Sequence, residues 1–258
     1  MKATKNLILA VILAVSINNQ SFAWGPIGHY VIGKLAEWQM KPQTVQKVEA
    51  ILHHESISGV GVWMDNIRSD RNYDYTNTWH WVTTADGEYD PSIQEESGDA
   101  YAAFLKIKET LKKGGLSPEE ERDQLRLLIH IVGDLHQPFH VGKPGDRGGN
   151  DVKVSFFNKE TNIHAIWDSD LIEGKKMSYT EIATELQKRI NPELIYKYTS
   201  KTPADWLREA AAIRPDMYDI PENGRIGYEY IYKHYHHVEE RLTAGGIRLA
   251  QVLEEIYG

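Results

Sequence analysis

Apolar side chains recur at helical spacing along most of the chain. In residues 28–40, "GHYVIGKLAEWQM", they fall on one side of a helix, and the same spacing returns in residues 44–54 and 99–113. From residue 179 onward the pattern is helical again. Breaks in that region are expected at Pro192, Pro203 and Pro221. The pattern therefore predicts a protein made mostly of α-helices.

The clearest start signal for a helix lies at residues 117–120, "SPEE". Ser117 is placed to cap the helix, Pro118 suits its first position, and Glu120 completes a capping box. This helix should run through "LRLLIHIVGDLH", residues 125–136, until Pro138 disturbs it.

One β-hairpin is predicted to interrupt the helices. Residues 151–157, "DVKVSFF", and 161–167, "TNIHAIW", have the character of two strands and follow a glycine-rich loop. No repeat, low-complexity tract or long linker divides the chain. We therefore predict a mostly α fold with one small β-hairpin, built as a single domain over residues 24–258.

The first 23 residues differ from the rest. Lys2 and Lys5 precede an apolar run from Leu7 to Ile17, and a small-x-small sequence ends at Ala23. This combination is typical of a secretory signal peptide cleaved at that point, and the run is shorter than the ~20 residues of a membrane helix. We expect an exported protein, periplasmic or extracellular, without stable membrane association. An uncleaved anchor helix is the weaker alternative.

Charge and cysteine content narrow the possible functions. The formal charge is −8, and it becomes −10 once the two lysines of the leader are removed. An acidic protein lacks the broad basic face of a general DNA-binding protein, so chemistry on a polyanion would need a concentrated local source of positive charge. Cysteine is absent, and a chain of this length can bury a full core without disulfides.

Two pairs of histidine and aspartate stand four residues apart. His130 and Asp134 share one face of a predicted helix, and His164 and Asp168 repeat the spacing just after the hairpin. One such pair alone is more often a surface ion pair. Two pairs beside His140, in a chain without cysteine, favour a metal with nitrogen and oxygen ligands, and zinc is the leading choice.

Two further segments carry candidates for the same centre. "WMDNIRSD" contains Asp65 and Arg68, and "NTWHWVT" places His80 between two tryptophans. Taken alone, Asp65 is better explained as a helix cap and His80 as a buried core histidine. His136 lies on a different face from His130 and is interpreted as a packing residue.

In this order the segments resemble the zinc-dependent type I nucleases, a family of fungal and plant single-strand-specific nucleases with secreted bacterial relatives. The family pattern starts with a tryptophan at the mature N-terminus and a histidine five residues later, here Trp24 and His29. Its later motifs are matched here by "WMDNIR", "WHW", "HIVGDLHQPFH", "GGN" and "HAIWD". The zinc-dependent phospholipase C enzymes are a more distant resemblance. Residues after about 175 carry none of these motifs.

The resemblance implies a helical fold of the phospholipase C and type I nuclease kind, with three Zn²⁺ ions in one cleft. By position, the ligands of the first ion would be Asp65, His80, His130 and Asp134, and those of the second His140, His164 and Asp168. The third ion would be held by His29, by Asp134 as a shared ligand, and by the amine and carbonyl of Trp24.

The Trp24 assignment gives signal cleavage a chemical purpose. While Ala23 is attached, the nitrogen of Trp24 is an amide with no lone pair for a metal. Cleavage turns it into an amine with a pKa of ~8, which zinc can bind. Processing would then complete the active site.

The resemblance also implies phosphodiester hydrolysis that leaves 5′-phosphate products. Water between two zinc ions loses a proton near neutral pH. Asp65 would orient this water, and Arg68 would contact the phosphate, although a surface ion pair is the alternative for Arg68. The ions supply the positive charge that the acidic chain lacks. The same cleft should also remove 3′-phosphates from nucleotides.

Three positions bear on the substrate. Trp81 occupies a position where the family stacks a base, which requires an unpaired base but no particular sequence; a buried core tryptophan is an equal alternative. Asn150 in the glycine-rich loop matches a family residue that hydrogen-bonds the base edge; the alternative is an ordinary turn asparagine without a role in binding. Thr83 departs from the family, whose fungal and plant members often carry an acid there, so the base preference is left open.

We therefore predict a monomeric enzyme that acts on single-stranded DNA, on RNA and on nucleotides. A phospholipase C would keep the zinc ligands, but the "GGN" loop and Trp81 favour bases over lipids. A non-catalytic zinc-binding protein would need neither Asp65 nor Arg68 in the assigned roles. The histidine cluster near the C-terminus suggests adventitious metal binding, but a solvated helix face is the favoured interpretation. The histidines outside the motifs are His53, His54, His234, His236 and His237.

Overall fold

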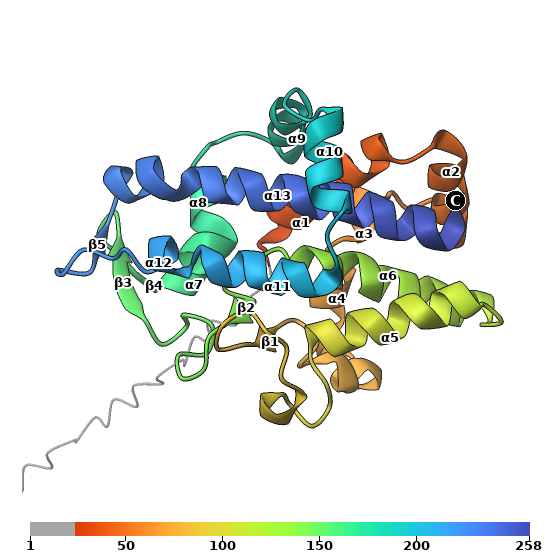
Figure 1. Cartoon of the computed structure of the whole chain (residues 1–258), viewed down its shortest axis with the longest axis horizontal. Helices are drawn as coiled ribbons and strands as arrows, with labels where there is room; N and C mark the ends of the chain where they lie inside the picture. The colour runs from red at the N-terminus through yellow and green to blue at the C-terminus, as the bar shows by residue number, and fades with distance from the viewer. Residues whose placement is uncertain (1–23) are drawn as a thin grey trace, which may run out of the picture.

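The computed structural model describes residues 24–258, and the predicted signal peptide lies outside them. Helices dominate these residues, so the predicted mostly α fold is confirmed (Figure 1). The longest helix, α13 (Tyr228–Tyr257), has 30 residues and spans most of the long axis of the molecule. Within the described range, no helix has the length and apolar character needed to cross a membrane.

Three helices form the centre of the fold. α1 (Pro26–Gln39) and α6 (Pro118–Asp134) both pack against α13. The approach of α1 to α13 depends on a glycine, because a Cβ at Gly246 would lie 2.4 Å from the Cβ of Leu35. Most buried apolar side chains of these helices belong to one cluster that extends along the chain from Trp24 to Tyr257, while Ala244 and Ile247 of α13 join a smaller cluster with Tyr198.

The start of α6 agrees with its sequence signal. The Ser117 hydroxyl accepts a hydrogen bond from the N–H of Glu120 at 3.3 Å, and the Glu120 carboxylate accepts one from the N–H of Ser117 at 2.9 Å. The helix ends at Asp134, two residues before the predicted limit, and a tight turn leads on to His140. Because of this turn, the side chains of Asp134 before Pro138 and His140 after it can face the same cluster of residues.

The predicted hairpin is present, but its second strand is shorter than expected. β3 (Lys153–Phe156) pairs antiparallel with β4 (Lys159–Asn162) across a turn of two residues with φ angles of 47° and 68°. Residues 163–167, predicted as strand, are helical instead. The reason is a cap: the Asn162 side chain accepts a hydrogen bond from the N–H of Ala165 at 2.8 Å. The helical residues are α7 (Ile163–Ala165) and a π-helical turn, η4 (Ile166–Asp170).

Two short strand pairings were not predicted. β5 (Arg225–Ile226) extends the hairpin by pairing in parallel with β3, and β1 (Val82–Thr83) pairs in parallel with β2 (Val141–Gly142). Strands of two residues are too short to show an alternating pattern. The β1–β2 pairing matters for the site, because His80 lies just before β1 and His140 just before β2.

The remaining elements surround this centre. Before α6 they are α2 (Pro42–Ile51), α3 (Ile57–Val60), α4 (Trp63–Asn66), η1 (Ile67–Ser69), η2 (Arg71–Thr76), η3 (Pro91–Ile93) and α5 (Ala100–Lys113). After η4 they are α8 (Leu171–Glu173), α9 (Tyr179–Gln187), α10 (Pro192–Thr199), α11 (Pro203–Ala212) and α12 (Arg214–Met217). The breaks predicted at prolines are confirmed, because Pro192 and Pro203 each begin a helix.

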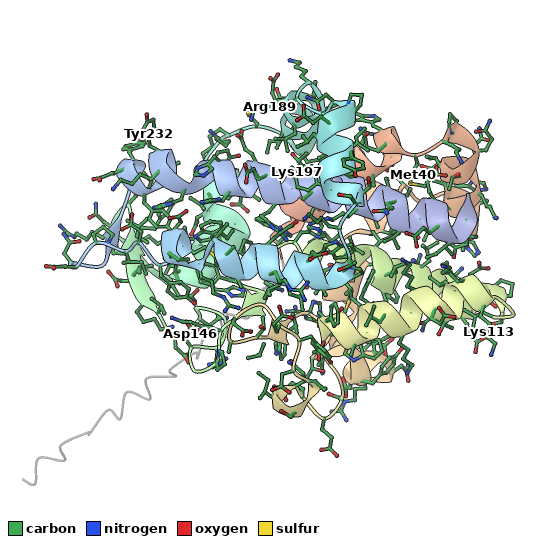
Figure 2. All side chains as sticks on the ribbon, in the orientation of Figure 1. Met40, Lys113, Asp146, Arg189, Lys197 and Tyr232 are labelled. Atoms are coloured by element: carbon green, nitrogen blue, oxygen red, sulfur yellow. The ribbon has the colours of Figure 1, made fainter. Side chains whose placement is uncertain are left out.

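The outer surface is predominantly polar. Figure 2 shows three outward-facing cations, Lys113 at the end of α5, Arg189 in the turn after α9 and Lys197 on α10. Several aromatic residues are also exposed, and Tyr232, which projects from the N-terminal half of α13, is 91% exposed.

Candidate metal centre

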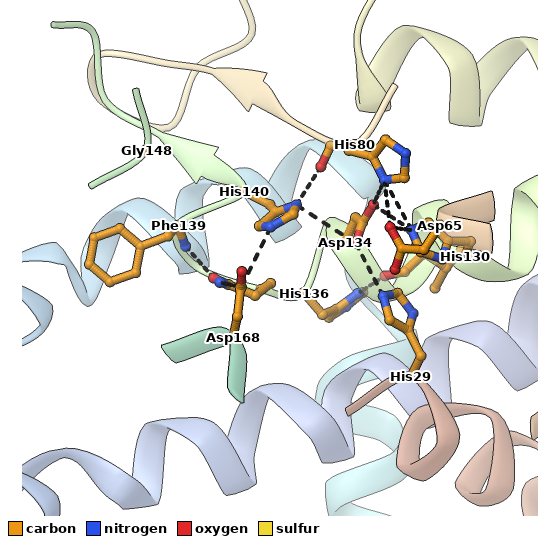
Figure 3. A network of polar contacts seen from close by, with 12 residues as sticks. His29, Asp65, His80, His130, Asp134, His136, Phe139, His140, Gly148 and Asp168 are labelled. Atoms are coloured by element: carbon orange, nitrogen blue, oxygen red, sulfur yellow. Dashed lines mark hydrogen bonds and ion pairs between the residues drawn. The ribbon is translucent and has the colours of Figure 1, made fainter. Parts of the chain in front are cut away.

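The predicted metal ligands converge from segments that are far apart in the sequence (Figure 3). α6 lies at the middle of the cluster, with its C-terminal end directed into it. The ligands are His29 on α1, Asp65 on α4, His80 before β1, His130 and Asp134 on α6, His140 before β2, His164 on α7 and Asp168 in η4. The arrangement brings every histidine and aspartate of the predicted set together.

Helical spacing accounts for the two pairs read from the sequence. His130 Nε2 lies 3.1 Å from an oxygen of Asp134, one turn along α6. His164 Nε2 lies 3.0 Å from an oxygen of Asp168. The second pair spans the π-helical turn η4, a distortion that occurs often at functional sites.

The donor atoms form three overlapping groups. In each group they lie within 4.8 Å of one another, as ligands of one ion must. The groups are His80, His130 and Asp134; His140, His164 and Asp168; and His29, Asp65 and His130. Asp134 also lies beside the third group, with an oxygen 3.4 Å from His29 Nε2. Asp65 is 3.9 Å from His80 Nδ1, so it borders the first group as well.

Trp24 lies at the edge of this cluster. Its side chain is fully buried, and the N–H of the next residue, Gly25, donates a hydrogen bond to the backbone carbonyl of Asp168 at 2.7 Å. The start of α1 is therefore fixed against the segment that carries two predicted ligands.

Several ligand atoms are buried without hydrogen-bond partners. Within residues 24–258 this holds for Nε2 of His29, His140 and His164, Oδ2 of Asp65, Oδ1 of Asp134 and Oδ2 of Asp168, whereas Oδ1 of Asp65 forms an ion pair with Arg68. A buried polar group left unpaired costs about 1–3 kcal/mol, and native proteins rarely contain many of them. So many unpaired nitrogen and oxygen atoms in one cluster are what metal coordination requires. These residues therefore fit a metal centre.

The other ring nitrogens of three histidines fix their orientation. Nδ1 of His130 lies 2.7 Å from the carbonyl of Gly61, and Nδ1 of His164 lies 2.6 Å from the carbonyl of Gly148. Nδ1 of His140 contacts the carbonyl of His80. A carbonyl can only accept, so each Nδ1 carries the proton and each Nε2 presents its lone pair. Metal-binding histidines are commonly held in this way.

The electrostatics favour the metal-binding form of two histidines and two aspartates, but not of His140. Burial acts to lower the pKa of His140, but Asp134 and Asp168 outweigh burial and raise it to about 9, so this ring must release a proton when it binds a metal. Burial lowers the pKa of His80 to about 4, and burial together with His130 lowers that of His29. Burial alone would raise the pKa of Asp134, but the neighbouring His130 and His140 outweigh burial and hold this pKa well below its usual value. The pKa of Asp168 is lowered in the same sense by His164 and His140 against burial. The carboxylates are thus ionised.

Sequence reasoning missed Gln137, which lies within the motif "HIVGDLHQPFH". Its side-chain amide donates a hydrogen bond to Oδ1 of Asp168, and its amide oxygen accepts one from the N–H of Phe139. Gln137 therefore links the turn after α6 to a ligand from η4. An amide that is fully buried beside a carboxylate is a positioning residue.

The last third of the chain, which carries no motif, supports the same turn. Arg241 on α13 donates a hydrogen bond to the backbone carbonyl of His136 at 3.2 Å, and Arg248 approaches His136 Nε2 at 3.2 Å. Glu209 on α11 pairs with both arginines, at 2.8 and 2.7 Å. His136 is fully buried and has no place in the metal groups, which agrees with its interpretation as a packing residue.

An open cavity of about 920 Å³ leads to the cluster. His80, His140 and His164 line its floor, and Arg68, Trp81, Thr83 and Asn150 line it as well. Trp81 is 38% exposed, so the alternative of a core tryptophan does not hold. Arg68 forms an ion pair with Asp65 at 2.9 Å while it lines the cavity.

Two charged features of this cavity were not predicted. Glu95 lines the cavity. The residue before it, Gln94, hydrogen-bonds the backbone of Thr83 through its side chain. Two cations from the loop after β2, Lys143 and Arg147, also line the cavity, so its lining carries charges of both signs. A loop glutamate and loop cations have no spacing signal, so sequence alone could not place them there.

The C-terminal histidines correct the sequence interpretation. His234 and His237 do not lie on a solvated face, because they are 4% and 8% exposed. Their ring nitrogens contact Asp219 and Asp216, in and just after α12. This face of α13 is covered by α12 and the residues after it, and the local sequence of α13 carries no sign of that contact.

Comparisons with known proteins agree with the geometry. A sequence model of the family described as S1/P1 Nuclease matches residues 24–258. Endonuclease 2 of Arabidopsis thaliana is 28% identical over 91% of this chain and 91% of its own length. Nuclease P1 of Penicillium citrinum is 24% identical over 91% of this chain and 98% of its own. Nuclease S1 of Aspergillus oryzae is 26% identical over 62% of this chain and 58% of its own. The chain thus belongs to the S1/P1 nuclease family and is a nuclease, a hydrolase that acts on ester bonds of nucleic acids.

Proposed function

We propose that this nuclease hydrolyses single-stranded DNA and RNA at a centre of three zinc ions and leaves 5′-phosphate products. The observation that carries the proposal is the set of buried, unpaired nitrogen and oxygen atoms at the floor of an open cavity. Nitrogen and oxygen donors without sulfur suit zinc. Two of the three donor groups share His130, whose Nε2 can bind one ion only, so the third ion would be held by His29, the shared Asp134 and the backbone of Trp24. Terminal 3′-phosphates of nucleotides would fit the same cavity.

The roles of individual residues follow from their positions. Bound zinc would lower the pKa of water and neutralise phosphate charge. Asp65 has both oxygens buried at the cluster and would accept a hydrogen bond from the attacking water. Arg68 extends from Asp65 into the cavity, where its guanidinium would bind a phosphate oxygen.

The selectivity for unpaired bases would come from Trp81. Its half-exposed indole lies next to His80 at the cavity wall, and a base can stack on it only when it is free of its duplex partner. Asn150 lines the same cavity and would hydrogen-bond the base edge. We further propose that the protein is exported, cleaved before Trp24 and active as a monomer of one domain.

The purified protein tests this function directly. Matched oligonucleotides, one single-stranded and one duplex, together with RNA and phosphatidylcholine vesicles, should be assayed beside elemental analysis of the protein. We expect cleavage of single-stranded DNA and RNA, slow cleavage of the duplex, no action on the lipid, and at least three zinc ions per chain. Equal rates on the duplex would contradict the strand preference, and fully active protein with one zinc would contradict the three-ion centre.

Trp81→Ala tests the stacking proposal. We expect single-stranded substrate to bind more weakly by ~1–3 kcal/mol, because one stacked base loses its platform. Zinc content should stay at the wild-type level. Trp38→Ala is the matched control, since Trp38 is 42% exposed on α1 and does not line the cavity. Unchanged binding after Trp81→Ala would show that the indole does not hold a base.

Gln137→Leu tests the positioning of Asp168. We expect ~10–100-fold weaker zinc binding at one site, because the variant removes the hydrogen bond that orients this ligand. Competition with a chelator, followed by the zinc released per chain, measures the change. Gln43→Leu on the exposed face of α2 serves as control. Release of all zinc ions in parallel would instead indicate a general loss of folding.

A further inference from the structure

A second group of metal-type ligands lies between α12 and α13. One carboxylate oxygen of Asp216 and one ring nitrogen each of His234 and His237 lie within 4.8 Å of one another. Asp219 adds a fourth candidate, with an oxygen 3.2 Å from His234 Nε2. None of these residues belongs to the groups that form the centre described above.

The geometry of the group follows from two elements. His234 and His237 are three residues apart on α13, so their side chains emerge from the same face. Asp216 belongs to α12 and lies 2.8 Å from His237 Nε2. The two helices therefore supply ligands from opposite sides, as a bridging ion requires.

The two histidines of this group are buried, whereas its two aspartates are half exposed and form its rim. The imidazole side chains are 6% and 10% exposed, whereas those of Asp216 and Asp219 are 54% and 56% exposed. The buried imidazoles lose little freedom when they bind an ion, and the exposed carboxylates leave a path for its entry. Moreover, Nδ1 of His237 is buried without a hydrogen-bond partner among the described residues, so hydrogen bonding does not saturate this ring.

The charges around the group favour a cation. Two carboxylates face two imidazoles, with Asp219 3.2 Å from His234 Nε2 and Asp216 2.8 Å from His237 Nε2. The nearest lysine, Lys233, lies 4.0 Å from Asp219 but is engaged more closely by Glu229, at 2.8 Å. Two nitrogen donors and one or two carboxylate oxygens, without sulfur, form a ligand set that zinc accepts.

We propose that Asp216, His234 and His237, with Asp219 at the rim, form an additional zinc site that joins α12 to α13. This site is independent of the three-ion proposal and carries no substrate. The effect of the ion is structural, because an ion held by both helices would link α12 to α13, the longest helix of the fold.

The position of the site connects it to the catalytic scaffold. Tyr230, one turn before His234 on α13, donates its hydroxyl to the carbonyl of Met217 at 2.6 Å. The same hydroxyl accepts a hydrogen bond from Nε1 of Trp167 at 2.8 Å, and Trp167 adjoins the ligand Asp168. An ion that holds α12 in place would therefore stabilise the hydrogen bonds by which Met217 and Tyr230 support Trp167 in η4.

The test compares two adjacent histidines. Untagged wild-type enzyme, His237→Ala and His236→Ala are dialysed against the same free Zn²⁺ concentration, and the zinc bound per chain is measured. His236 is the matched control, because it is exposed and packs its ring against His237 but belongs to no ligand group. We expect His237→Ala to bind one zinc ion fewer than both other proteins, whatever number the wild type holds.

Asp216→Asn provides a second variant that removes charge from a half-exposed side chain. We expect it to bind this zinc at least tenfold more weakly and to show a smaller rise in melting temperature on addition of Zn²⁺ than the His236→Ala control. Equal zinc content in wild type, His237→Ala and Asp216→Asn would overturn the additional site. A failure of the three-ion proposal would appear differently, as a low zinc count in all of these proteins.

Discussion

Asp134→Asn is expected to lower nuclease activity by ~10³-fold or more. In the proposed three-ion centre each ion would supply several kcal/mol of transition-state stabilisation, and Asp134 lies in contact with more than one of the donor groups. Its Oδ2 lies 3.1 Å from both His80 and His130. Its Oδ1 lies 3.4 Å from His29 and 3.7 Å from His140. Asparagine keeps the shape but removes the negative charge that these sites share. We therefore expect more than one zinc ion to be lost per chain.

Asp168→Asn is the matched comparison for this prediction. Asp168 contacts His140 and His164 only, at 3.6 and 3.0 Å, so its replacement should mainly affect one ion. Zinc content, activity and circular dichroism should be measured for both variants. If Asp134→Asn lost no more zinc than Asp168→Asn while both remained folded, Asp134 would not be a shared ligand.

The periodic helices and their caps could be predicted from the sequence because their signals are local. Ser117 and Glu120 form their capping box within one turn, and the apolar spacing of α1 and α5 is complete within each helix. The error in the hairpin came from a segment of seven residues, which is too short to separate strand from helix. There the cap by Asn162 decided the outcome.

The candidate metal ligands were identified from ordered motifs rather than from spacing alone. Spacing links only His130 with Asp134 and His164 with Asp168, and no local pattern brings His29 or His80 to them. The supporting residues were missed because they come from other parts of the chain. Arg241 and Arg248 lie seven residues apart on α13, and their burial against Glu209 becomes visible only when α11 packs beside that helix.

An enzyme with one additional alanine before Trp24 is expected to lose most of its activity near neutral pH, by ~10²-fold or more if one ion is lost. The start of α1 is fixed beside Asp168 by the hydrogen bond from Gly25, and Trp24 is fully buried there. A free amine at Trp24, together with its carbonyl, could chelate zinc through a five-membered ring. An amide in the same place is a very poor zinc ligand at neutral pH, and the extra residue would also crowd the cluster.

The remaining ligands of that ion, His29 and the shared Asp134, would hold it weakly in the extended enzyme. The other ions should stay bound, because His140, His164 and Asp168 do not depend on the N-terminus for their contacts. Trp24→Phe with a free N-terminus is the control, since it changes the buried indole but keeps both backbone donors. We expect it to retain more activity than the extended enzyme when both are assayed in folded form. If the extended enzyme were fully active, with its additional alanine verified by mass spectrometry, the backbone of Trp24 would have no part in binding the metal.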